Sequence, residues 1–187
     1  MKKTNDITQE KLADAFKAER PHLLRYACYR LGNEDDAKDV LQDTFLRLHT
    51  RIADADDLQI NNLRSYIFRT LTNVCAKWQT DANKIKTIPL DMRIDVADTH
   101  YMGNEAEYRR IASLLTEIPD EQAEVIRLRI YGDNSFAEVA EILSLPLPTV
   151  KSRFLYGLEK LRKGLKKQLA TIKRHDYELQ RFQEQGG

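Results

Sequence analysis

The sequence contains few residues that interrupt a helix. Its 187 residues include only seven glycines and five prolines, so long stretches of the chain can remain helical. Few windows alternate apolar and polar residues with a period of two, which argues against a β-sheet. Hydrophobic residues make up 42% of the chain and charged residues 32%, a balance typical of a globular protein. The sequence therefore predicts an all-α fold.

Other absences exclude whole classes of protein and site. No apolar run approaches the roughly 20 residues of a membrane-spanning helix, and no apolar segment of the signal-peptide type follows Met1–Glu10. Cys28 and Cys75 each lie alone in an apolar helical pattern, so we expect buried free thiols and a reducing compartment. The four histidines lack the spacing of metal ligands. These observations predict a cytoplasmic protein with no membrane contact, metal site or cofactor.

Charge is strongly segregated along the chain, although the formal net charge is only +1. Residues 148–174 contain nine basic side chains and one acid, whereas residues 33–57 contain eight acids and three bases. Such segregation indicates two partners of opposite character, one of them a polyanion. The nine basic residues are Lys151, Arg153, Lys160, Arg162, Lys163, Lys166, Lys167, Lys173 and Arg174, against Glu159. The eight acids are Glu34, Asp35, Asp36, Asp39, Asp43, Asp54, Asp56 and Asp57, against Lys38, Arg47 and Arg51.

Helical periodicity fills the first part of the chain. A helix that begins near Leu12 is predicted to be followed by a second helix that Gly32 ends in a left-handed cap. Asn33 is predicted to cap a third, amphipathic helix. The polar segment Ala53–Asn62 is predicted to be a loop, and Leu63–Trp78 a further helix.

Two helical domains are predicted, joined by a flexible linker. Periodicity is lost after residue 79 and returns near Glu105. Pro119 is predicted to open a helix at its first turn, and Gly132 to end that helix. The predicted divisions are an N-terminal domain, 1–79, a linker, 80–104, a C-terminal domain, 105–168, and an extension, 169–187, of which the last five residues should fray.

Residues 135–161 carry the pattern of a helix-turn-helix. Ser135 with Glu138 forms a capping box that opens a short helix. Pro146 and Pro148 fit the turn, because the first turn of a helix does not use their missing N–H groups. The inner stripe of the second helix is formed by Val150, Phe154, Leu158 and Leu161.

The outer face of that second helix has the chemistry of a DNA-recognition helix. Basic side chains contact phosphates or guanine edges, hydroxyls hydrogen-bond to phosphates or bases, and apolar groups touch thymine methyls. The alternative is a basic face that is merely solvated. The predicted DNA-binding residues are Thr149, Lys151, Ser152, Arg153, Leu155, Tyr156 and Lys160.

Several runs of residues resemble a known family. Ile118-Pro119, Ser135-Phe136, Glu138–Ala140 and Thr149–Arg153 resemble the C-terminal promoter-binding region of extracytoplasmic-function sigma factors, a group of the bacterial sigma-70 family. Independently, Leu31–Asn33 and Asp36–Leu48 are similar to the helix with which this family docks on the polymerase clamp. Arg64–Arg69 and Asn73 are similar to the promoter-melting helix that follows it.

The resemblance implies a sigma factor that binds core RNA polymerase and directs promoter recognition and transcription initiation. It also implies promoter DNA and an anti-sigma factor as partners, and no bond chemistry of the chain's own. The implied polymerase-binding residues are Asp36, Asp39, Gln42, Asp43 and Phe45. The implied contacts to the melted promoter element are Arg64, Phe68, Arg69, Asn73 and Lys77, because cations bind phosphates and aromatic or amide groups bind extruded bases.

Some residues depart from the family pattern. Tyr66 stands where a tryptophan is common, and Pro146 and Pro148 stand where serine and glycine are common. Three other functions remain open from the residues alone: a stand-alone regulator with an unrelated helical sensor, a helical adaptor for an acidic protein, and an enzyme. The enzyme has the least support, because the sequence carries no phosphate-binding glycine loop, metal cluster or nucleophile with an evident base.

Overall fold

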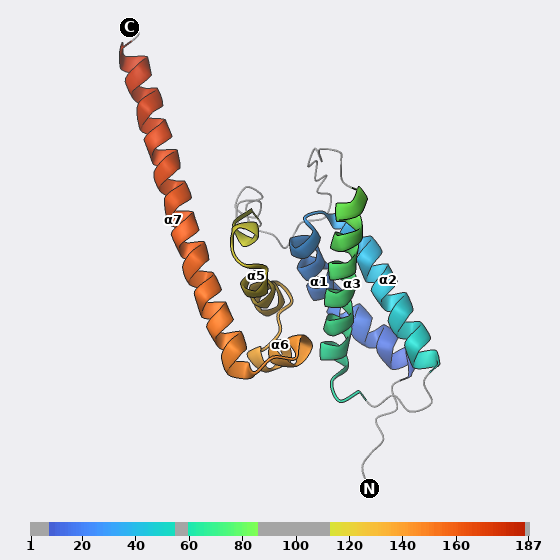
Figure 1. Ribbon diagram of the computed structural model, residues 1–187. Coiled ribbons are helices and arrows are strands. Elements are labelled where there is room, and N and C mark those ends of the chain that lie inside the picture. The colour runs from blue at the N-terminus through green and yellow to red at the C-terminus, as the bar shows by residue number, and fades with distance from the viewer. Residues whose placement is uncertain (1–7, 55–59, 86–112, 186–187) are drawn as a thin grey trace.

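The computed structural model describes backbone residues 8–54, 60–85 and 113–185, and the side chains in these ranges except 81–85, 168 and 171–185. Every regular element within these ranges is helical (Figure 1), so the predicted all-α fold is confirmed. The predicted linker lies outside the described residues from residue 86 onward, and so does the segment near Glu105.

The first helix, α1 (Gln9–Leu31), is continuous where the sequence predicted two helices. Pro21 lies inside it and has no N–H to donate to the preceding turn. Leu12 and Leu23, on either side of the proline, are both fully buried in one core. Tertiary packing on this shared face outweighs the lost hydrogen bond, because most helical stability in a protein comes from such packing.

The predicted caps between the first two helices are confirmed. Gly32 has φ 84°, a left-handed conformation that glycine adopts without strain, and its N–H donates to Cys28 O at 2.8 Å. Asn33 then opens α2 (Glu34–Ala53), and its side-chain oxygen accepts from the Asp36 N–H at 2.7 Å. These local signals fix where α1 ends and α2 begins.

The third helix, α3 (Leu63–Ile85), is longer than the predicted Leu63–Trp78 and extends six residues into the predicted linker. Its extension is tied to α1, since the Gln79 side chain donates to Arg30 O at 2.9 Å. Trp78 is half-buried and packs on the core. The helices α1, α2 and α3 pack against one another as a three-helix unit (Figure 1).

The C-terminal domain begins with a helical turn, 113–117, followed by α5 (Asp120–Ile126) and a π-helical turn, η1 (Arg127–Tyr131). Pro119 was predicted to be the first residue of this helix, but it is the N-cap, and α5 begins one residue later at Asp120. Gly132 ends η1 as predicted, and its N–H donates to Arg127 O at 2.9 Å.

The predicted helix-turn-helix is confirmed as α6 (Phe136–Leu143) and α7 (Leu147–Gln185). Both halves of the capping box are present: Glu138 N donates to Ser135 Oγ at 3.2 Å, and Ser135 N donates to Glu138 Oε2 at 2.7 Å. The helix α7 continues to Gln185, through three residues that were expected to fray. No glycine or proline interrupts the chain between Gly164 and Gly186, so nothing in the sequence ends the helix earlier.

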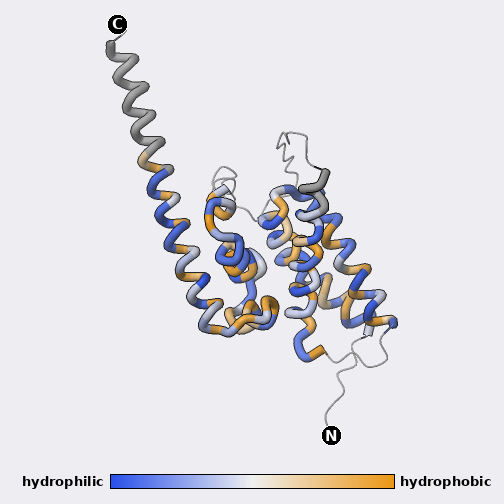
Figure 2. The backbone as a smooth tube through the Cα atoms, in the orientation of Figure 1, coloured by the Kyte–Doolittle hydropathy of each residue, from blue (hydrophilic) through white to orange (hydrophobic). Residues whose placement is uncertain are grey.

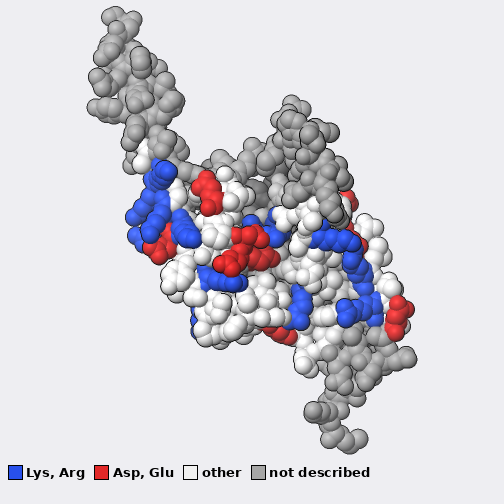
Figure 3. Space-filling view, viewed as in Figure 1, with Lys and Arg blue, Asp and Glu red and all other residues white. Residues whose placement is uncertain are grey.

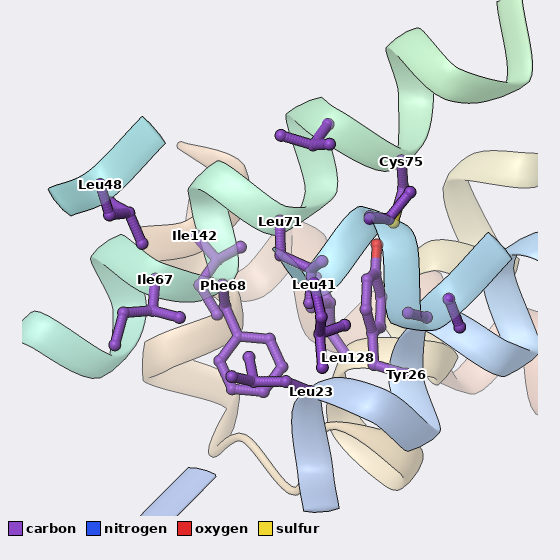
Figure 4. Close-up of a cluster of buried hydrophobic side chains, with 14 of the residues drawn as sticks. Leu23, Tyr26, Leu41, Leu48, Ile67, Phe68, Leu71, Cys75, Leu128 and Ile142 are labelled. Atoms are coloured by element: carbon purple, nitrogen blue, oxygen red, sulfur yellow. The ribbon is translucent and has the colours of Figure 1, made fainter. Parts of the chain in front are cut away.

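The two domains pack together and share one hydrophobic core. Figure 2 shows hydrophobic residues gathered where the helices pack, and Figure 4 shows Leu128 and Ile142 beside residues of α1, α2 and α3. Leu128 is fully buried and Ile142 is 3% exposed. The C-terminal contributors to this core are Val125, Leu128, Val139, Ile142 and Val150.

Candidate nucleic-acid interface

The first turns of α7 present an open outer face beside a buried inner one. Val150 is fully buried, whereas Leu155 and Tyr156 are 65% and 61% exposed. Lys151 and Lys160 are also exposed, while Thr149 and Ser152 are half-buried, and the Ser152 hydroxyl donates to Thr149 O at 2.9 Å. Six of the seven residues predicted to bind DNA here are thus on or at the border of one accessible face.

Arg153 is the exception on this helix. Its Nη2 donates to Glu121 Oε2 of α5 at 2.7 Å, and the arginine side chain is 28% exposed against 56% for the glutamate. The ion pair positions the start of α7 on α5. Arg153 can therefore bind DNA only if its ion pair with Glu121 is broken.

A run of cations continues along α7 beyond the turn. Figure 3 shows Lys and Arg gathered on this helix. The one acid among the described side chains of α7, Glu159, is paired with Lys163 at 2.8 Å, and this hydrogen bond lowers the pKa of the carboxyl group. A face of this composition suits the phosphates of a polyanion. Its exposed members are Lys160, Arg162, Lys163, Lys166 and Lys167.

Gly157 allows α7 to approach α5 closely. A methyl group at this position would lie 2.7 Å from Ile126 Cδ1 and 3.3 Å from Gln122 Cβ. We expect Gly157→Leu to lower the free energy of unfolding by about 1–3 kcal/mol, because the core has no room for the side chain. Arg162→Leu, on the exposed side of the same helix, should change it by less than about 0.5 kcal/mol. Chemical denaturation measures both, and equal effects would contradict the proposed close approach.

The residues predicted to contact a melted strand do not share one open surface on α3. Phe68 is fully buried in the core, contrary to the expectation of an accessible aromatic ring, because α1 and the C-terminal domain cover it. Arg64 Nη2 donates to Gly132 O and to Asp133 O, at 2.9 Å each, and Arg69 donates to Glu141 O and, at 3.3 Å, to Ile142 O.

Asn73 and Lys77 are exposed as expected, and they line a hollow that the sequence did not predict. Its volume is about 380 Å³, and Arg47, Leu48, Arg51, Thr70 and Val74 complete its walls. The hollow lies between α2 and α3, so it places cations of both helices beside the exposed amide.

A second cavity, of about 260 Å³, lies at the start of α3. Two polar atoms there, Ser65 Oγ and Tyr66 Oη, are buried with no hydrogen-bond partner among the described residues, so they can bind a polar ligand. Asn61, Asn62 and Ser65 were not predicted as site residues, and the pair of asparagines just before α3 is the sequence signal that points to them. The cavity is lined by Arg51, Ile60, Asn61, Asn62, Ser65, Tyr66, Arg69 and Glu141.

Some of the predicted polymerase-binding residues of α2 are exposed, and the others already contact side chains of the same chain. Asp39 and Gln42 are exposed. Asp36 is hydrogen-bonded to the Asn33 cap, and Asp43 pairs with Arg47 at 2.9 Å. Phe45 is half-buried and packs edge-on against Phe16, with ring centroids 5.2 Å apart.

Leu46 lies on this face of α2 and was not among the predicted polymerase-binding residues. It is 54% exposed, and its spacing from Asp39 and Gln42 places all three on one side of α2. A single exposed leucine is common on protein surfaces, so Leu46 is a candidate here only because it lies in register with Asp39 and Gln42. In the sequence, Leu46 could have been recognised because its helical spacing places it on the same side as Asp39 and Gln42.

The described residues contain no cluster of three or more His, Cys, Asp or Glu side chains that could bind a metal ion. None of the described helices combines the length and the apolar character that crossing a bilayer requires.

Comparison with known proteins assigns both domains. The family Sigma-70 region 2 matches residues 15–85, and the family Sigma-70, region 4 matches residues 114–163. The ECF RNA polymerase sigma factor SigW of Bacillus subtilis is 30% identical over 154 residues, which cover 74% of this chain and 81% of SigW. The RNA polymerase sigma-E factor of Streptomyces avermitilis is 27% identical over 143 residues, which cover 76% of this chain and 78% of the relative.

Solved structures agree on the fold. CnrH in complex with the cytosolic domain of CnrY has a TM-score of 0.62 at 23% identity, over 85% of this chain and 90% of that one. The sigma factor RpoE in complex with the anti-sigma factor NepR from Bartonella quintana has a TM-score of 0.66 at 19% identity, over 84% of this chain and 98% of that one. Region 2 and then region 4 follow one another along this chain, and the chain belongs to the extracytoplasmic-function group of the sigma-70 family, the sigma factors that direct RNA polymerase to promoters.

Proposed function

We propose that this sigma factor binds core RNA polymerase through the exposed side of α2 and reads promoter DNA through α7 and α3. The proposal rests on one observation: the exposed face of α2 and the basic face of α7 are separate surfaces. Asp39, Gln42 and Leu46 form an acidic and apolar face, and α7 forms a basic one. An acidic face repels DNA but suits a basic protein surface, whereas the basic face suits phosphates.

Upstream duplex DNA is assigned to the outer face of α7. The N-terminal part of a recognition helix contacts base edges, so Lys151, Ser152, Leu155 and Tyr156 are the proposed reading residues. Lys160 and the cations that follow it lie farther along the same helix and are proposed to contact phosphates. Arg153 is given a positioning role through Glu121 in addition to its proposed DNA contact.

The melted strand is assigned to the outer side of α3. Asn73, Lys77 and Arg51 supply an amide and two cations along the hollow between α2 and α3. The cavity at Asn62, whose buried hydroxyls lack partners, is proposed to accept an extruded base, since flipped bases are bound by hydrogen bonds in closed pockets. Arg64 and Phe68, which the C-terminal domain covers, can take part only when that domain moves away, whereas Arg69 is exposed but donates to Glu141 O and Ile142 O.

The upstream assignment is tested by salt dependence. Lys160→Ala combined with Lys166→Ala should reduce the slope of log binding constant against log salt by up to about 2 for duplex promoter DNA, because each lost phosphate contact contributes about 0.9. Sequence preference should not change. Lys17→Ala, an exposed lysine of α1, is the matched control and should leave the slope unaltered. An unchanged slope in the double variant would contradict phosphate contact by α7.

Run-off transcription tests the function as a whole. Core polymerase reconstituted with this chain should produce a transcript from the region upstream of the chain's own coding sequence or from a selected promoter library, and core polymerase alone should not. The variant Leu46→Ala with Asp39→Arg should lose co-purification with core polymerase. Equal co-purification of variant and parent would overturn the assignment of the α2 face.

An anti-sigma factor is the proposed regulatory partner, because a structural neighbour is a sigma factor bound to the anti-sigma factor NepR. The proposed location is the cytoplasm, where polymerase and promoters are found. We assign no bond chemistry to the chain itself.

A further inference from the structure

Arg153 is a cation of the helix-turn-helix that is held by another helix of the same domain. Its Nη2 donates to Glu121 Oε2 of α5 at 2.7 Å, and its side chain is 28% exposed. Lys151 and Lys160, which lie on either side of it along α7, are both exposed. Glu121 therefore keeps one positive charge away from the face that is proposed to bind upstream duplex.

Glu121 is fixed in place independently of its ion pair with Arg153. It lies in the first turn of α5, and the next residue, Gln122, donates its N–H to Pro119 O at 2.9 Å. The helix α5 packs against α7 (Figure 1), so closely that a methyl group on Gly157 would lie 3.3 Å from Gln122 Cβ. The carboxylate therefore remains beside α7 whether or not Arg153 is bound to it.

Arg153 lies on the side of α7 that also bears a proposed phosphate contact. Residues 153, 156 and 160 are three and four positions apart, so Arg153, Tyr156 and Lys160 share one side of the helix. Arg153 is nearer the N-terminus of α7, the end of a recognition helix that contacts base edges in the major groove. Once released from Glu121, Arg153 can therefore bind a phosphate on the same side as Lys160 and closer to the bases.

A carboxylate and a phosphate compete for the same guanidinium group. Both can accept the paired N–H groups of an arginine. The Glu121 side chain is 56% exposed, and an ion pair this close to solvent is weak enough for a well-placed phosphate to replace it.

The competition matters for specificity because phosphates occur in every DNA sequence. An arginine that is always released raises the affinity for all duplexes alike. An arginine that is released only on the correct sequence raises the affinity for that sequence alone. Specificity is the difference between these two affinities, so the carboxylate that holds the arginine can determine it.

We infer that Glu121 determines the specificity of this factor for its upstream element: Arg153 stays on Glu121 over an unrelated duplex and passes to a phosphate only when base contacts place α7 in the matching groove. The inference rests on the proposed assignment of α7 to upstream duplex. Lys151 and Tyr156 bring the DNA backbone within reach of Arg153 only where their base contacts are made. Glu121 is a positioning residue, because it acts through Arg153 and not on DNA.

The first experiment compares two duplexes. One is selected by the full-length parent chain from a random duplex library, and the other has the same bases in scrambled order. Glu121→Ala should raise the affinity for the scrambled duplex about fivefold and steepen its slope of log binding constant against log salt by about 0.9, the contribution of one phosphate contact. Affinity for the selected duplex should change by less than about twofold, because Arg153 already contacts a phosphate there. An unchanged ratio of the two affinities would overturn the inference.

Removal of the arginine tests the same competition from the other side. In the parent, Arg153→Ala should reduce the salt slope by about 0.9 on the selected duplex and leave the slope on the scrambled duplex unchanged. In Glu121→Ala, the further change Arg153→Ala should cancel the gain on the scrambled duplex. A pair that only joined α5 to α7 would give no such cancellation, since loss of both partners would weaken binding to either duplex. Equal slope reductions on both duplexes in the parent would show that Glu121 does not hold Arg153 back.

Two further variants separate this role from general repulsion between an acid and DNA. Glu117→Ala removes the same charge from another exposed acid of the C-terminal domain and should leave the affinity ratio unaltered. Glu121→Gln keeps an oxygen that accepts from Arg153 but weakens the pair, so its ratio should lie between those of the parent and Glu121→Ala. A ratio as low in Glu117→Ala as in Glu121→Ala would contradict the inference.

Failure of the proposed function gives a different result. A parent chain that selects no sequence from the library, and whose salt slope is unaltered by Lys160→Ala with Lys166→Ala, does not read upstream duplex, and the inference then fails together with the proposed function. A chain that selects a sequence but keeps its affinity ratio in Glu121→Ala disproves only the role of Glu121.

Discussion

Phe68→Ala is expected to lower the free energy of unfolding by about 3–5 kcal/mol, because it removes a fully buried ring and leaves a cavity between the two domains. The ring contacts residues of both domains, and its edge faces Tyr26 with centroids 6.1 Å apart. Urea denaturation followed by circular dichroism measures the loss. A change below about 1 kcal/mol would show that Phe68 is not part of the core in solution.

The conservative variant Phe68→Leu separates the structural role of this residue from a role in DNA binding. Leucine restores most of the apolar volume, so the loss of stability should fall to less than about 1.5 kcal/mol. Leucine cannot stack on a base. If Phe68 becomes a stacking residue once the domains open, Phe68→Leu should fold normally and yet reduce promoter melting, which permanganate reactivity of the melted strand detects.

Glu124→Ala is expected to lower the free energy of unfolding by about 3 kcal/mol, because it leaves buried cations without their partner. Glu124 Oε2 lies 3.5 Å from Arg30 Nη1 and 3.3 Å from Arg127 Nη1, and these three side chains are only 12%, 11% and 5% exposed. Burial lowers the pKa of Arg30, but Glu124 and Asp120 raise it by more, so the guanidinium stays charged. Asp120 pairs with both arginines and limits the loss to the lower end of the usual range.

Glu121→Ala is the matched control for this prediction. Glu121 lies in the same helix, but its side chain is 56% exposed and its ion pair with Arg153 is near the surface. Removal of an exposed pair changes stability by less than about 1 kcal/mol. Thermal and urea denaturation of the two variants should differ clearly. Similar losses would show that the Arg30–Glu124–Arg127 cluster does not link the domains as tightly as its geometry indicates.

The predictions that succeeded depended on local chemistry. Gly32, Asn33 and the Ser135 capping box each act within a few residues of their own position, so the sequence is enough to locate them. Buried positions of α2 such as Val40, Leu41 and Leu48 follow from helical spacing in the same way.

The predictions that failed depended on distant partners. The continuity of α1 through Pro21 requires a core to which both halves of the helix contribute, and the extension of α3 is tied to Arg30 O through Gln79. The DNA contacts predicted for Arg64, Phe68 and Arg69 remain predictions, but the sequence did not indicate the partners that these side chains have within the chain. The partners of the two arginines are 68 to 73 residues away, and no periodicity encodes such pairs.

The sequence by itself determined the helix caps and the helix-turn-helix, because caps, turn prolines and apolar periodicity act over a few residues. Membership of the sigma-70 family followed instead from the resemblance of its motifs. Only the tertiary structure decided which of the candidate DNA-binding residues are accessible. That decision rests on side chains of α1 and α3 that meet main-chain carbonyls and apolar groups of the C-terminal domain, contacts made by folding across the whole length of the chain. The outer face of α7, the proposed recognition face, is open, whereas Arg64 and Arg69 of α3 donate to main-chain carbonyls of the C-terminal domain.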